Sequence, residues 1–353
     1  MNDMDQGGLE IDFLQVGDGE RSGDAIALRY GNPLTGYEVI IIDGGNKASG
    51  EALVRHVITQ YGTTTVAHVV NTHPDGDHSS GLTEVLEHLD VKNLWMHRPW
   101  AYSAGLLNHF RDPRFTAGGL ESRLREALDA AHELETLASA RRIPINEPFQ
   151  GSMIGPFLVL SPEKNWYLRE LVPNFERTPQ AKRPVAGLLG PLFKATSDAA
   201  SWVAESLNFE TLGEDGETSA QNESSVVLYG NFAGNGVLFT GDAGRLALTR
   251  AIVYAQALGI SLQRLRCVQI PHHGSRRNVS PSVLNAITAQ IALVSVAPKS
   301  TSHPRRKVTN AFKRRGARVY RTNGGLLNYT INWPRRADIS DAPEIPFYDR
   351  VEA

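Results

Sequence analysis

Apolar and polar positions in the first part of the chain follow the short periods of strands and helices. Residues 9–16 (L-E-I-D-F-L-Q-V) alternate, and residues 38–43 (E-V-I-I-I-D) form an apolar run typical of a strand buried on both faces. The pattern predicts strands at 9–16, 24–30, 38–43, 66–72 and 91–96, and helices at 51–61 and 79–89. This order is typical of a layered α/β protein.

The same rhythm returns in the last third of the chain, after a segment of different character. Within residues 98–221 the pattern predicts a long amphipathic helix at 118–142, a strand near 157–162 and a helix-like patch at 193–208. Beyond it we expect strands at 224–230, 236–242, 265–270 and 291–297, helices at 245–258, 281–288 and 305–315, and a hairpin over 318–333 that turns at Asn323-Gly324. We therefore predict one domain over residues 1–336, with an insertion or cap at 98–221, and a loosely attached C-terminal tail at 337–353.

Composition limits the classes of protein to which the chain can belong. Hydrophobic residues make up 41% of its 353 residues, which suits a soluble globular protein with a sizeable core. No apolar run approaches the ~18 residues of a membrane span, and the acidic start M-N-D-M-D-Q-G-G does not resemble a signal peptide. We expect a cytoplasmic protein without a membrane partner, in which the lone Cys267 is a small buried hydrophobe.

Charged residues are distributed unevenly along the chain. The formal net charge is −2, yet the stretch from Arg245 to Arg336 contains 17 Lys and Arg residues and no Asp or Glu. Such asymmetry is typical of a surface that binds an anionic ligand. It is equally expected when the basic and acidic parts of one fold neutralise each other, so the charge pattern alone leaves both interpretations open.

One short motif carries four side chains that can bind a metal. The stretch N-T-H-P-D-G-D-H-S-S-G-L (71–82) follows a predicted buried strand and contains His73, Asp75, Asp77 and His78. Open α/β sheets bind ligands at the ends of their strands, and imidazole together with carboxylate suits a divalent cation. In the alternative interpretation Asp77 caps the next helix and the histidines face solvent. Four such ligands after a buried strand favour the metal site.

Three further predicted strands also end near His or Asp. G-V-L-F-T-G-D ends at Asp242, P-H-H-G-S places His272 and His273 after the next strand, and S-H-P places His303 after a fourth. Asp242 alone would be an ordinary turn residue. Adjacent histidines after a strand are expected to point in different directions, so one of His272 and His273 is predicted to bind metal. Together the strand ends predict a single convergent site.

These motifs resemble those of metallo-β-lactamase-fold hydrolases, whose first metal motif is His-x-His-x-Asp-His. H-P-D-G-D-H has Asp75 in place of the second His. Within that group the chain is most similar to the hydrolase domain of the bacterial competence protein for DNA uptake, although the membrane channel of that protein has no counterpart here. The shared stretches are F-L-Q-V-G, G-D-A-I-A-L, I-I-D-G-G, T-H-P-D-G-D-H, N-E-S-S-V-V-L, L-F-T-G-D, P-H-H-G-S and S-H-P. The resemblance covers residues 9–97 and 222–332, and it implies an αββα sandwich with a largely helical insertion between its two halves.

The resemblance also implies two metals about 3.5–4 Å apart that share a hydroxide. The ligands that it implies are His73 and Asp75 for the first metal, Asp77, His78 and one of His272 and His273 for the second, and Asp242 as the bridge. The family's middle histidine is missing, and Asn222 and Ser225 stand nearest its place, where we expect them to contact substrate. This oxygen-rich set favours Mn²⁺ or Zn²⁺ in one or two positions, with Mg²⁺ as a further candidate. Asp43 is expected to orient a ligand histidine or, alternatively, to form an ordinary turn.

Basic residues follow two of the predicted site loops directly. Arg276 and Arg277 come after His273, and Arg305 and Arg306 come after His303. We expect these four arginines to hold a substrate phosphate. Catalytic roles are expected for Asp77 in the metal loop and for His303, the latter as an acid or as a contact to the phosphate.

The leading hypothesis is therefore a metal-dependent phosphodiesterase or nuclease that cleaves DNA or RNA through a metal-bound hydroxide. One alternative keeps the metal site but changes the substrate to a small ester, lactone or cyclic phosphate, because the fold alone does not decide the substrate. Another is a degenerate protein that binds nucleic acid or a partner without catalysis. A protein partner encoded nearby is consistent with such a soluble relative, and the sequence leaves the oligomeric state open.

Overall fold

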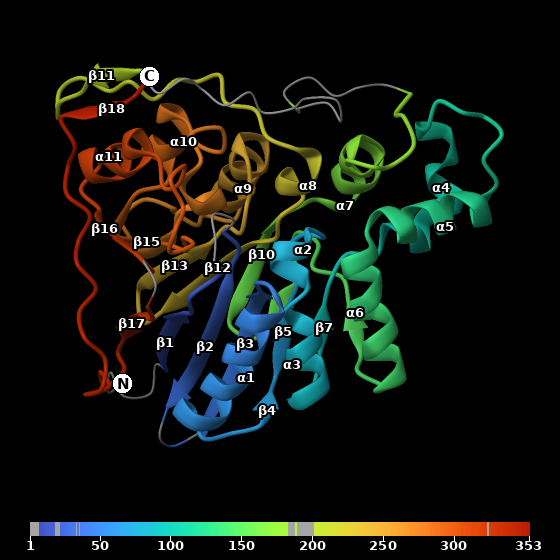
Figure 1. Cartoon of the computed structure of the whole chain (residues 1–353), viewed down its shortest axis with the longest axis horizontal. Coiled ribbons are helices and arrows are strands. Elements are labelled where there is room, and N and C mark those ends of the chain that lie inside the picture. Colours follow the sequence, from blue (N-terminus) through green and yellow to red (C-terminus); the bar gives the residue numbers. More distant parts are fainter. Residues whose placement is uncertain are drawn as a thin grey trace.

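Two seven-stranded β-sheets lie face to face at the centre of the molecule (Figure 1). This computed structural model describes residues 7–17, 22–32, 34, 36–182, 188, 201–322 and 325–353. The first sheet has the order β17 (Leu327–Ile331), β1 (Gly8–Phe13), β2 (Ala25–Asn32), β3 (Gly36–Gly44), β5 (His68–Val70), β7 (Leu94–Trp95) and β8 (Ile145–Asn146). The second has the order β16 (Arg318–Arg321), β15 (Ala289–Val294), β14 (Leu265–Gln269), β13 (Asn235–Phe239), β12 (Val227–Phe232), β10 (Phe157–Ser161) and β9 (Met153–Ile154).

Each sheet has an antiparallel half and a parallel half. In the first sheet, β17, β1, β2 and β3 pair antiparallel, and β3, β5, β7 and β8 pair parallel. In the second, β9, β10, β12 and β13 pair antiparallel, and β13 to β16 pair parallel. The carboxyl ends of parallel strands meet at one edge of a sheet, which is where α/β proteins bind ligands.

The alternation of side chains along a strand decides which core each one joins. In β3, Ile40 and Ile42 belong to the apolar core between the two sheets, whereas Val39 and Ile41 pack into the core beneath the outer helices. All four side chains are buried, since the sheet is covered on both faces. This explains why β3 reads as a continuous apolar run in the sequence.

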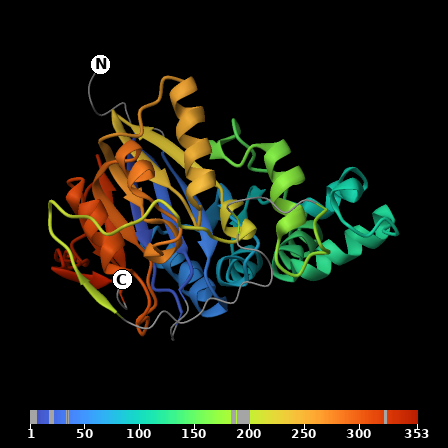
Figure 2. The ribbon, with the colours of Figure 1, turned by 90° about the horizontal axis from the view of Figure 1, so that it is seen from above.

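Helices cover the outer face of both sheets (Figures 1 and 2). The helices on the first sheet include α1 (Lys47–Gln60) and α3 (Leu82–His88), and those on the second are α9 (Arg245–Ala257), α10 (Pro281–Ala286) and α11 (Arg306–Arg314). Helix α1 begins after Asn46, whose side chain accepts a hydrogen bond from the Ser49 backbone N–H. The αββα sandwich predicted from the sequence is confirmed.

The segment expected to be an insertion supplies strands as well as helices. Strand β8 extends the first sheet, and β9 and β10 extend the second. The helix expected at 118–142 is divided into α5 (Ala117–Ala127) and α6 (Asp129–Ala140), because Leu128 leaves the helical conformation (ψ 45°) and is buried. The short elements elsewhere are β4 (Thr65–Val66), β6 (Asp90–Val91), α2 (Gly76–Ser79), α4 (Ser103–Leu106), α7 (Lys164–Trp166), α8 (Ala220–Glu223), the 3-10 turns Pro99–Tyr102, Leu107–His109, Val172–Asn174 and Pro271–Gly274, and the π turn Tyr167–Leu171. Across the described ranges, no helix combines the length and the apolar character needed to cross a bilayer.

Two predictions for the C-terminal part are wrong. The strands expected to form a hairpin over 318–333 lie in different sheets, because β17 pairs with β1 while β16 pairs with β15; the expected turn at Asn323-Gly324 lies outside the described residues. The tail is not loosely attached, since β18 (Arg350–Glu352) pairs antiparallel with β11 (Trp202–Ala204) and buries Val351. Strand β11 also replaces the helix expected at 193–208, of which residues 193–200 lie outside the described ranges.

Candidate metal centre

The carboxyl ends of strands from both sheets meet at one place. Strand β5 leads to His73, β13 leads to Asp242, and β14 leads to the pair His272 and His273. Asp43 lies at the end of β3 beside them. The predicted convergence of these strand ends is what the structure shows.

Asp242 occupies the middle of a ring of imidazoles. Its Oδ2 atom lies 3.5 Å from His78 Nε2, 3.6 Å from His272 Nε2 and 3.8 Å from His73 Nε2. Its Oδ1 atom lies 3.6 Å from His273 Nε2. These distances exceed those of good hydrogen bonds, so the ring atoms face the carboxylate across a gap. Although burial opposes it, His272, His78 and His273 hold the pKa of Asp242 well below its usual value, and the carboxylate is ionised.

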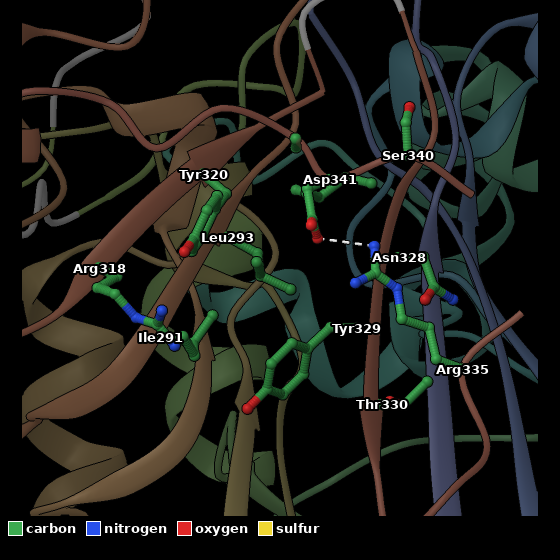
Figure 3. A pocket seen from close by; sticks show the side chains of 12 residues that line it. Ile291, Leu293, Arg318, Tyr320, Asn328, Tyr329, Thr330, Arg335, Ser340 and Asp341 are labelled. Atoms are coloured by element: carbon green, nitrogen blue, oxygen red, sulfur yellow. Dashed lines mark hydrogen bonds and ion pairs between the residues drawn. The ribbon is translucent and has the colours of Figure 1, made fainter. Parts of the chain in front are cut away.

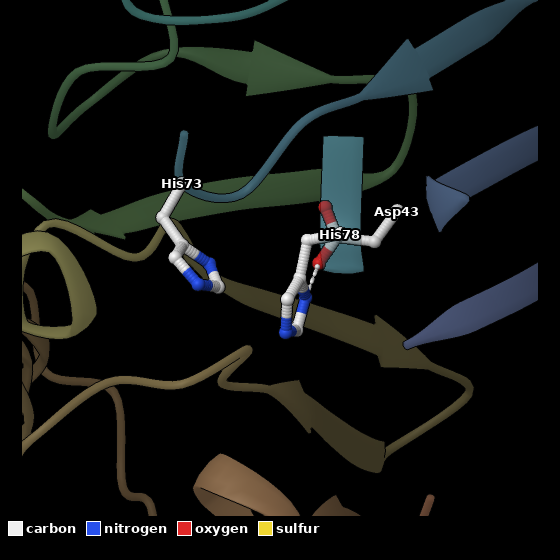
Figure 4. Close-up of side chains that lie close together, drawn as sticks. All are labelled: Asp43, His73 and His78. Atoms are coloured by element: carbon white, nitrogen blue, oxygen red, sulfur yellow. Dashed lines mark hydrogen bonds and ion pairs between the residues drawn. The ribbon is translucent and has the colours of Figure 1, made fainter. Parts of the chain in front are cut away.

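The other ring nitrogen of each of these histidines lies within hydrogen-bond distance of a partner, which for His73 is Thr72 Oγ1 at 3.0 Å. Nδ1 of His78 bonds to Asp43 Oδ2 at 2.8 Å (Figure 4), and Nδ1 of His273 bonds to the Ser295 carbonyl at 3.2 Å. Nδ1 of His272 lies 2.8 Å from Asn278 Oδ1. A ring that donates through Nδ1 presents the lone pair of Nε2 to the centre, which is how proteins orient histidine ligands of a metal.

Several buried polar atoms at the centre have no hydrogen-bond partner within the part of the chain that the structure describes. They are the Nε2 atoms of His73, His78 and His273 and the Oδ1 atom of Asp242. Leaving such atoms unsatisfied costs free energy, and divalent cations bound among them would satisfy all four. His78, Asp242 and His273 have ligand atoms within 4.8 Å of one another. These donors therefore fit a divalent cation.

Asp43, His73 and His78 also lie within 4.8 Å of one another (Figure 4). Both carboxylate oxygens of Asp43 already accept hydrogen bonds, from Thr72 N at 2.7 Å, from Thr72 Oγ1 at 2.6 Å and from His78 Nδ1 at 2.8 Å. Its place is therefore behind the ligands, where it orients His78. This position agrees with the role expected for Asp43 from the sequence.

The backbone of the His272–His273 pair adopts a rare conformation. Both residues have positive φ, 48° and 54°, in the left-handed region that non-glycine residues seldom occupy. The turn brings both rings to Asp242, one to each carboxylate oxygen. The two rings face different oxygens of Asp242, and within the described residues only His273 belongs to a buried group of possible metal ligands, so which of the two binds metal stays a prediction. Strain of this kind concentrates at functional sites.

The two aspartates of the first motif differ in position. Asp75 Oδ2 lies 3.8 Å from His73 Nε2, and burial, together with the charges of Asp77 and Asp242, raises the pKa of Asp75 against the effect of His73. Asp77 is exposed in the first turn of α2. Among the described residues, neither buried group of ligand atoms includes Asp77. Asp75 thus adjoins the centre, whereas the structure does not place Asp77 within it.

The polar residues near the missing histidine support the ligands. Ser225 Oγ accepts a hydrogen bond of 3.1 Å from the Asp242 backbone N–H, and Ser225 is fully buried. Asn222 Nδ2 donates to Thr218 Oγ1 at 2.7 Å and lies 3.3 Å from His272 Nδ1. These contacts fix the ligand loops, and they take the place of the substrate contacts expected for both residues.

His303 stacks against His272, with ring centroids 6.0 Å apart. Burial, together with the nearby His272, His273 and Arg305, lowers the pKa of His303 to about 3. The ring is therefore neutral at neutral pH. A neutral ring suits the predicted contact to substrate better than the alternative role of a charged acid.

The predicted substrate arginines have different surroundings. Arg276 donates to the carbonyl of Ala353 at 2.9 Å, and Arg276, Arg277 and Lys307 line a cavity of about 450 Å³ with the loop 211–217. The Arg305 backbone N–H donates to the Gly274 carbonyl at 3.1 Å, which joins the two site loops.

Arg306 does not lie among these groups. Its guanidinium lies 4.7 Å from the centre of the Trp202 ring and 4.5 Å from that of Tyr348. Its backbone N–H donates to Glu352. Arg306 therefore holds β18 against the fold, which corrects the expectation that it binds substrate.

Acidic residues of the same chain pair with several of the arginines from the basic stretch 245–336. Arg315 pairs with Glu210 at 2.8 Å, Arg336 with Asp12 at 3.0 Å, and Arg335 with Asp341 at 2.7 Å. Arg335 belongs to a separate cavity of about 380 Å³ between β15, β16 and β17, which none of the candidate metal ligands lines (Figure 3). Neutralisation thus accounts for these arginines, while Arg276, Arg277 and Lys307 remain grouped beside the site loops.

One buried carboxylate of the centre was not assigned from the sequence. Asp24 is 1% exposed, and its Oδ2 atom lies 3.9 Å from His78 Nδ1. The available signal was its place in G-D-A-I-A-L, directly before a buried strand. An Asp at such a position is also an ordinary turn residue, so the sequence alone does not separate the two roles.

Similarities to known proteins are found with one family model and with several solved structures. A family model described as "Metallo-beta-lactamase superfamily" matches residues 19–297. A search of curated proteins finds no match. Among solved structures, a mutant of the CmlA beta-hydroxylase is 12% identical, with 92% of this chain and 54% of that chain covered and a TM-score of 0.42. A metallo beta lactamase from Hirschia baltica is 15% identical (78% and 95% covered, TM-score 0.31), and a long form RNase Z from yeast is 10% identical (86% and 39% covered, TM-score 0.37).

Proposed function

The chain belongs to the metallo-beta-lactamase superfamily, and on this premise we propose that it is a metal-dependent hydrolase that cleaves phosphodiester bonds in nucleic acid. The observation that carries the proposal is the arrangement around Asp242, where four imidazole Nε2 atoms lie 3.5–3.8 Å from one carboxylate. A divalent cation bound there would supply Lewis acidity and activate water for hydrolysis.

Some residues of the site would bind the cations, and others hold the ligand rings in place. His78, His273 and Asp242 would hold one cation, and His73 with Asp75 would hold another. Asp43, Ser295 and Asn278 fix the rings of His78, His273 and His272 from behind. Carboxylate oxygen at Asp75, where the family more often has imidazole, favours Mn²⁺ or Zn²⁺ with a preference for the harder ion.

The choice of a phosphodiester rests on the basic residues beside the site loops. Arg276 and Arg277 follow His273 within three and four residues, and they share a cavity with Lys307. Lys307 is buried beside them, where Arg276 and Arg305 add positive charge and Glu352 and Glu205 add negative charge. Phosphate is the anion that guanidinium and ammonium groups recognise together. The resemblance of the motifs to the competence-protein hydrolase domain supports the same substrate class.

The test is to restore metal to chelator-treated protein and to offer it several substrates. Mn²⁺, Zn²⁺ or Mg²⁺ is added with labelled single- and double-stranded DNA, RNA, generic phosphodiesters and lactones. Metal-dependent cleavage of the polymers that is lost in Asp242→Asn supports the proposal. Turnover confined to small esters would overturn the nucleic-acid substrate, and binding of nucleic acid without turnover would overturn hydrolysis. Asp12→Asn, which changes a buried carboxylate outside the centre, is the matched control.

A further inference from the structure

Asp24 is a buried carboxylate that lies beside the segment of Asp77 and His78. It directly precedes β2, and the neighbouring Gly23 packs on the loop that carries Asp77 and His78. A Cβ atom at Gly23 would lie 2.0 Å from the Asp77 carbonyl oxygen, so the contact requires glycine. The turn before β2 is thereby fixed to the first metal motif.

A single glutamine links Asp24 to the strand that ends at Asp242. Gln269 Nε2 donates to Asp24 Oδ2 at 2.7 Å. The other end of the same amide, Oε1, accepts from Thr240 N at 2.9 Å and from Gly241 N at 3.1 Å. Because two backbone donors fix Oε1, the NH₂ group must face Asp24. The carboxylate is therefore held in one orientation relative to Asp242.

The remaining oxygen of Asp24, Oδ1, is buried and makes no hydrogen bond with any of the described residues. The charged groups that act on Asp24 are His273 and His78 on one side and the carboxylates of Asp242 and Asp43 on the other. By contrast, the buried Asp12 accepts hydrogen bonds from Tyr61 and Asn328 and forms ion pairs with His56 and Arg336.

The histidines near Asp24 do not balance its charge when they act as ligands. His78 and His273 bond through Nδ1 to Asp43 and to the Ser295 carbonyl, so as neutral rings they offer lone pairs at Nε2. A buried carboxylate without a compensating charge is costly. The charge of a cation held by those Nε2 atoms would offset this cost.

We propose that Asp24 is a carboxylate of the metal centre, which strengthens cation binding at the position formed by His78, His273 and Asp242. This inference rests on the proposed function, because it needs the metal centre to exist. Asp24 acts through its negative charge and through its Oδ1 atom, which is buried and accepts no hydrogen bond from the described residues. Its place is that of a positioning residue, since no contact with substrate is assigned to it.

The test compares Mn²⁺ binding and stability in Asp24→Asn and in the wild type. Titration followed by Mn²⁺ electron paramagnetic resonance, with the bound stoichiometry from elemental analysis, should show one position weakened about 10–100-fold, the usual effect of removing a supporting carboxylate. In chelator, the melting temperature of Asp24→Asn should stay close to that of the wild type, because the substituted amide keeps an oxygen that accepts from Gln269 Nε2.

The control is Asp12→Asn, in which a paired buried carboxylate is lost. It should lower the melting temperature and leave Mn²⁺ affinity unchanged. Unchanged Mn²⁺ affinity in Asp24→Asn, or a loss of stability in chelator like that of Asp12→Asn, would overturn the role of Asp24 while leaving the proposed function intact. If the wild type binds neither Mn²⁺ nor Zn²⁺, the proposed metal centre is refuted, and the role of Asp24 is refuted with it. Should Asp24→Asn fail to fold, Asp24→Ser, which keeps an acceptor for Gln269, gives the same comparison.

Discussion

His78 and Asp43 form a buried pair in which Nδ1 of the imidazole bonds to Oδ2 of the carboxylate at 2.8 Å. The bond turns Nε2 of His78 toward Asp242, 3.5 Å away. Asp43 comes from β3, and His78 comes from the short helix α2 that follows β5. The parallel pairing of β3 with β5 therefore sets the direction in which Nε2 of His78 points.

Asp43→Asn should weaken Mn²⁺ binding about 10–100-fold without unfolding the protein. The Asp43 backbone has a φ of 56°, which Asn tolerates well, so the turn is kept while the charge behind His78 is lost. Calorimetric titration with Mn²⁺ measures the change. Equal affinities in the variant and the wild type would show that Asp43 serves the turn alone.

Metal should stabilise the wild type and not Asp242→Asn. At a free Mn²⁺ concentration of about 100 times the Kd, binding to the native state adds ~2.7 kcal/mol to the free energy of unfolding. In Asp242→Asn this gain should largely disappear, because the shared carboxylate at the centre is gone. Melting curves with Mn²⁺ and with chelator give the comparison. A gain in the variant as large as in the wild type would contradict the central place of Asp242.

His97→Phe should remove part of the loss of stability in acid. His97 is buried against Phe149 and Tyr167, neither ring nitrogen has a hydrogen-bond partner among the described residues, and burial lowers the pKa of His97 to about 3. The unfolded chain, with a His pKa of about 6.5, binds the proton more readily, so this contribution to stability is present above that pH and is lost as pH falls toward 3. At pH 5 the loss is about 2 kcal/mol relative to pH 8.

The measurement is the difference in unfolding free energy between pH 8 and pH 5, for the wild type and for His97→Phe. Other groups titrate in both proteins and cancel in the comparison. The variant should show the smaller difference, and the same difference in both proteins would mean that His97 accepts a proton without unfolding.

Gly23→Ala should destabilise the protein and weaken metal binding together. The new Cβ atom would meet the Asp77 carbonyl oxygen at 2.0 Å, so the loop of Asp77 and His78 must shift. Overpacking of this kind costs about 1–3 kcal/mol. Gly118→Ala in helix α5 is the matched control, since nothing lies within 4 Å of its added Cβ and Ala favours the helix. Urea unfolding and Mn²⁺ titration of both variants would test this, and an undisturbed Gly23→Ala would refute the tight contact.

Local pattern predicted the layers and most of the site, because the information lies within single strands and the loops that follow them. A buried strand such as β3 is recognised by its apolar run, and Asp43 near its carboxyl end must then lie at the sheet edge. The same reasoning placed His73, His78 and Asp242 at one edge, where the structure brings them together.

Other features depend on partners far apart in the chain, and only the tertiary structure decided them. The rings of His272 and His273 both reach Asp242 because of a backbone turn with two positive φ angles, which no residue pattern announces. The same holds for Arg306, which lies against Trp202 and Tyr348 and not in the site.

Asp24 shows the physical reason most clearly. Its partner Gln269 is 245 residues away, and their hydrogen bond exists because β2 and β14 lie in sheets packed against each other. The residues after each strand, which can bind a metal, follow from sequence alone. The tertiary structure decides which charges are buried together and which oxygen can bind a cation, because these depend on packing between strands far apart in the sequence.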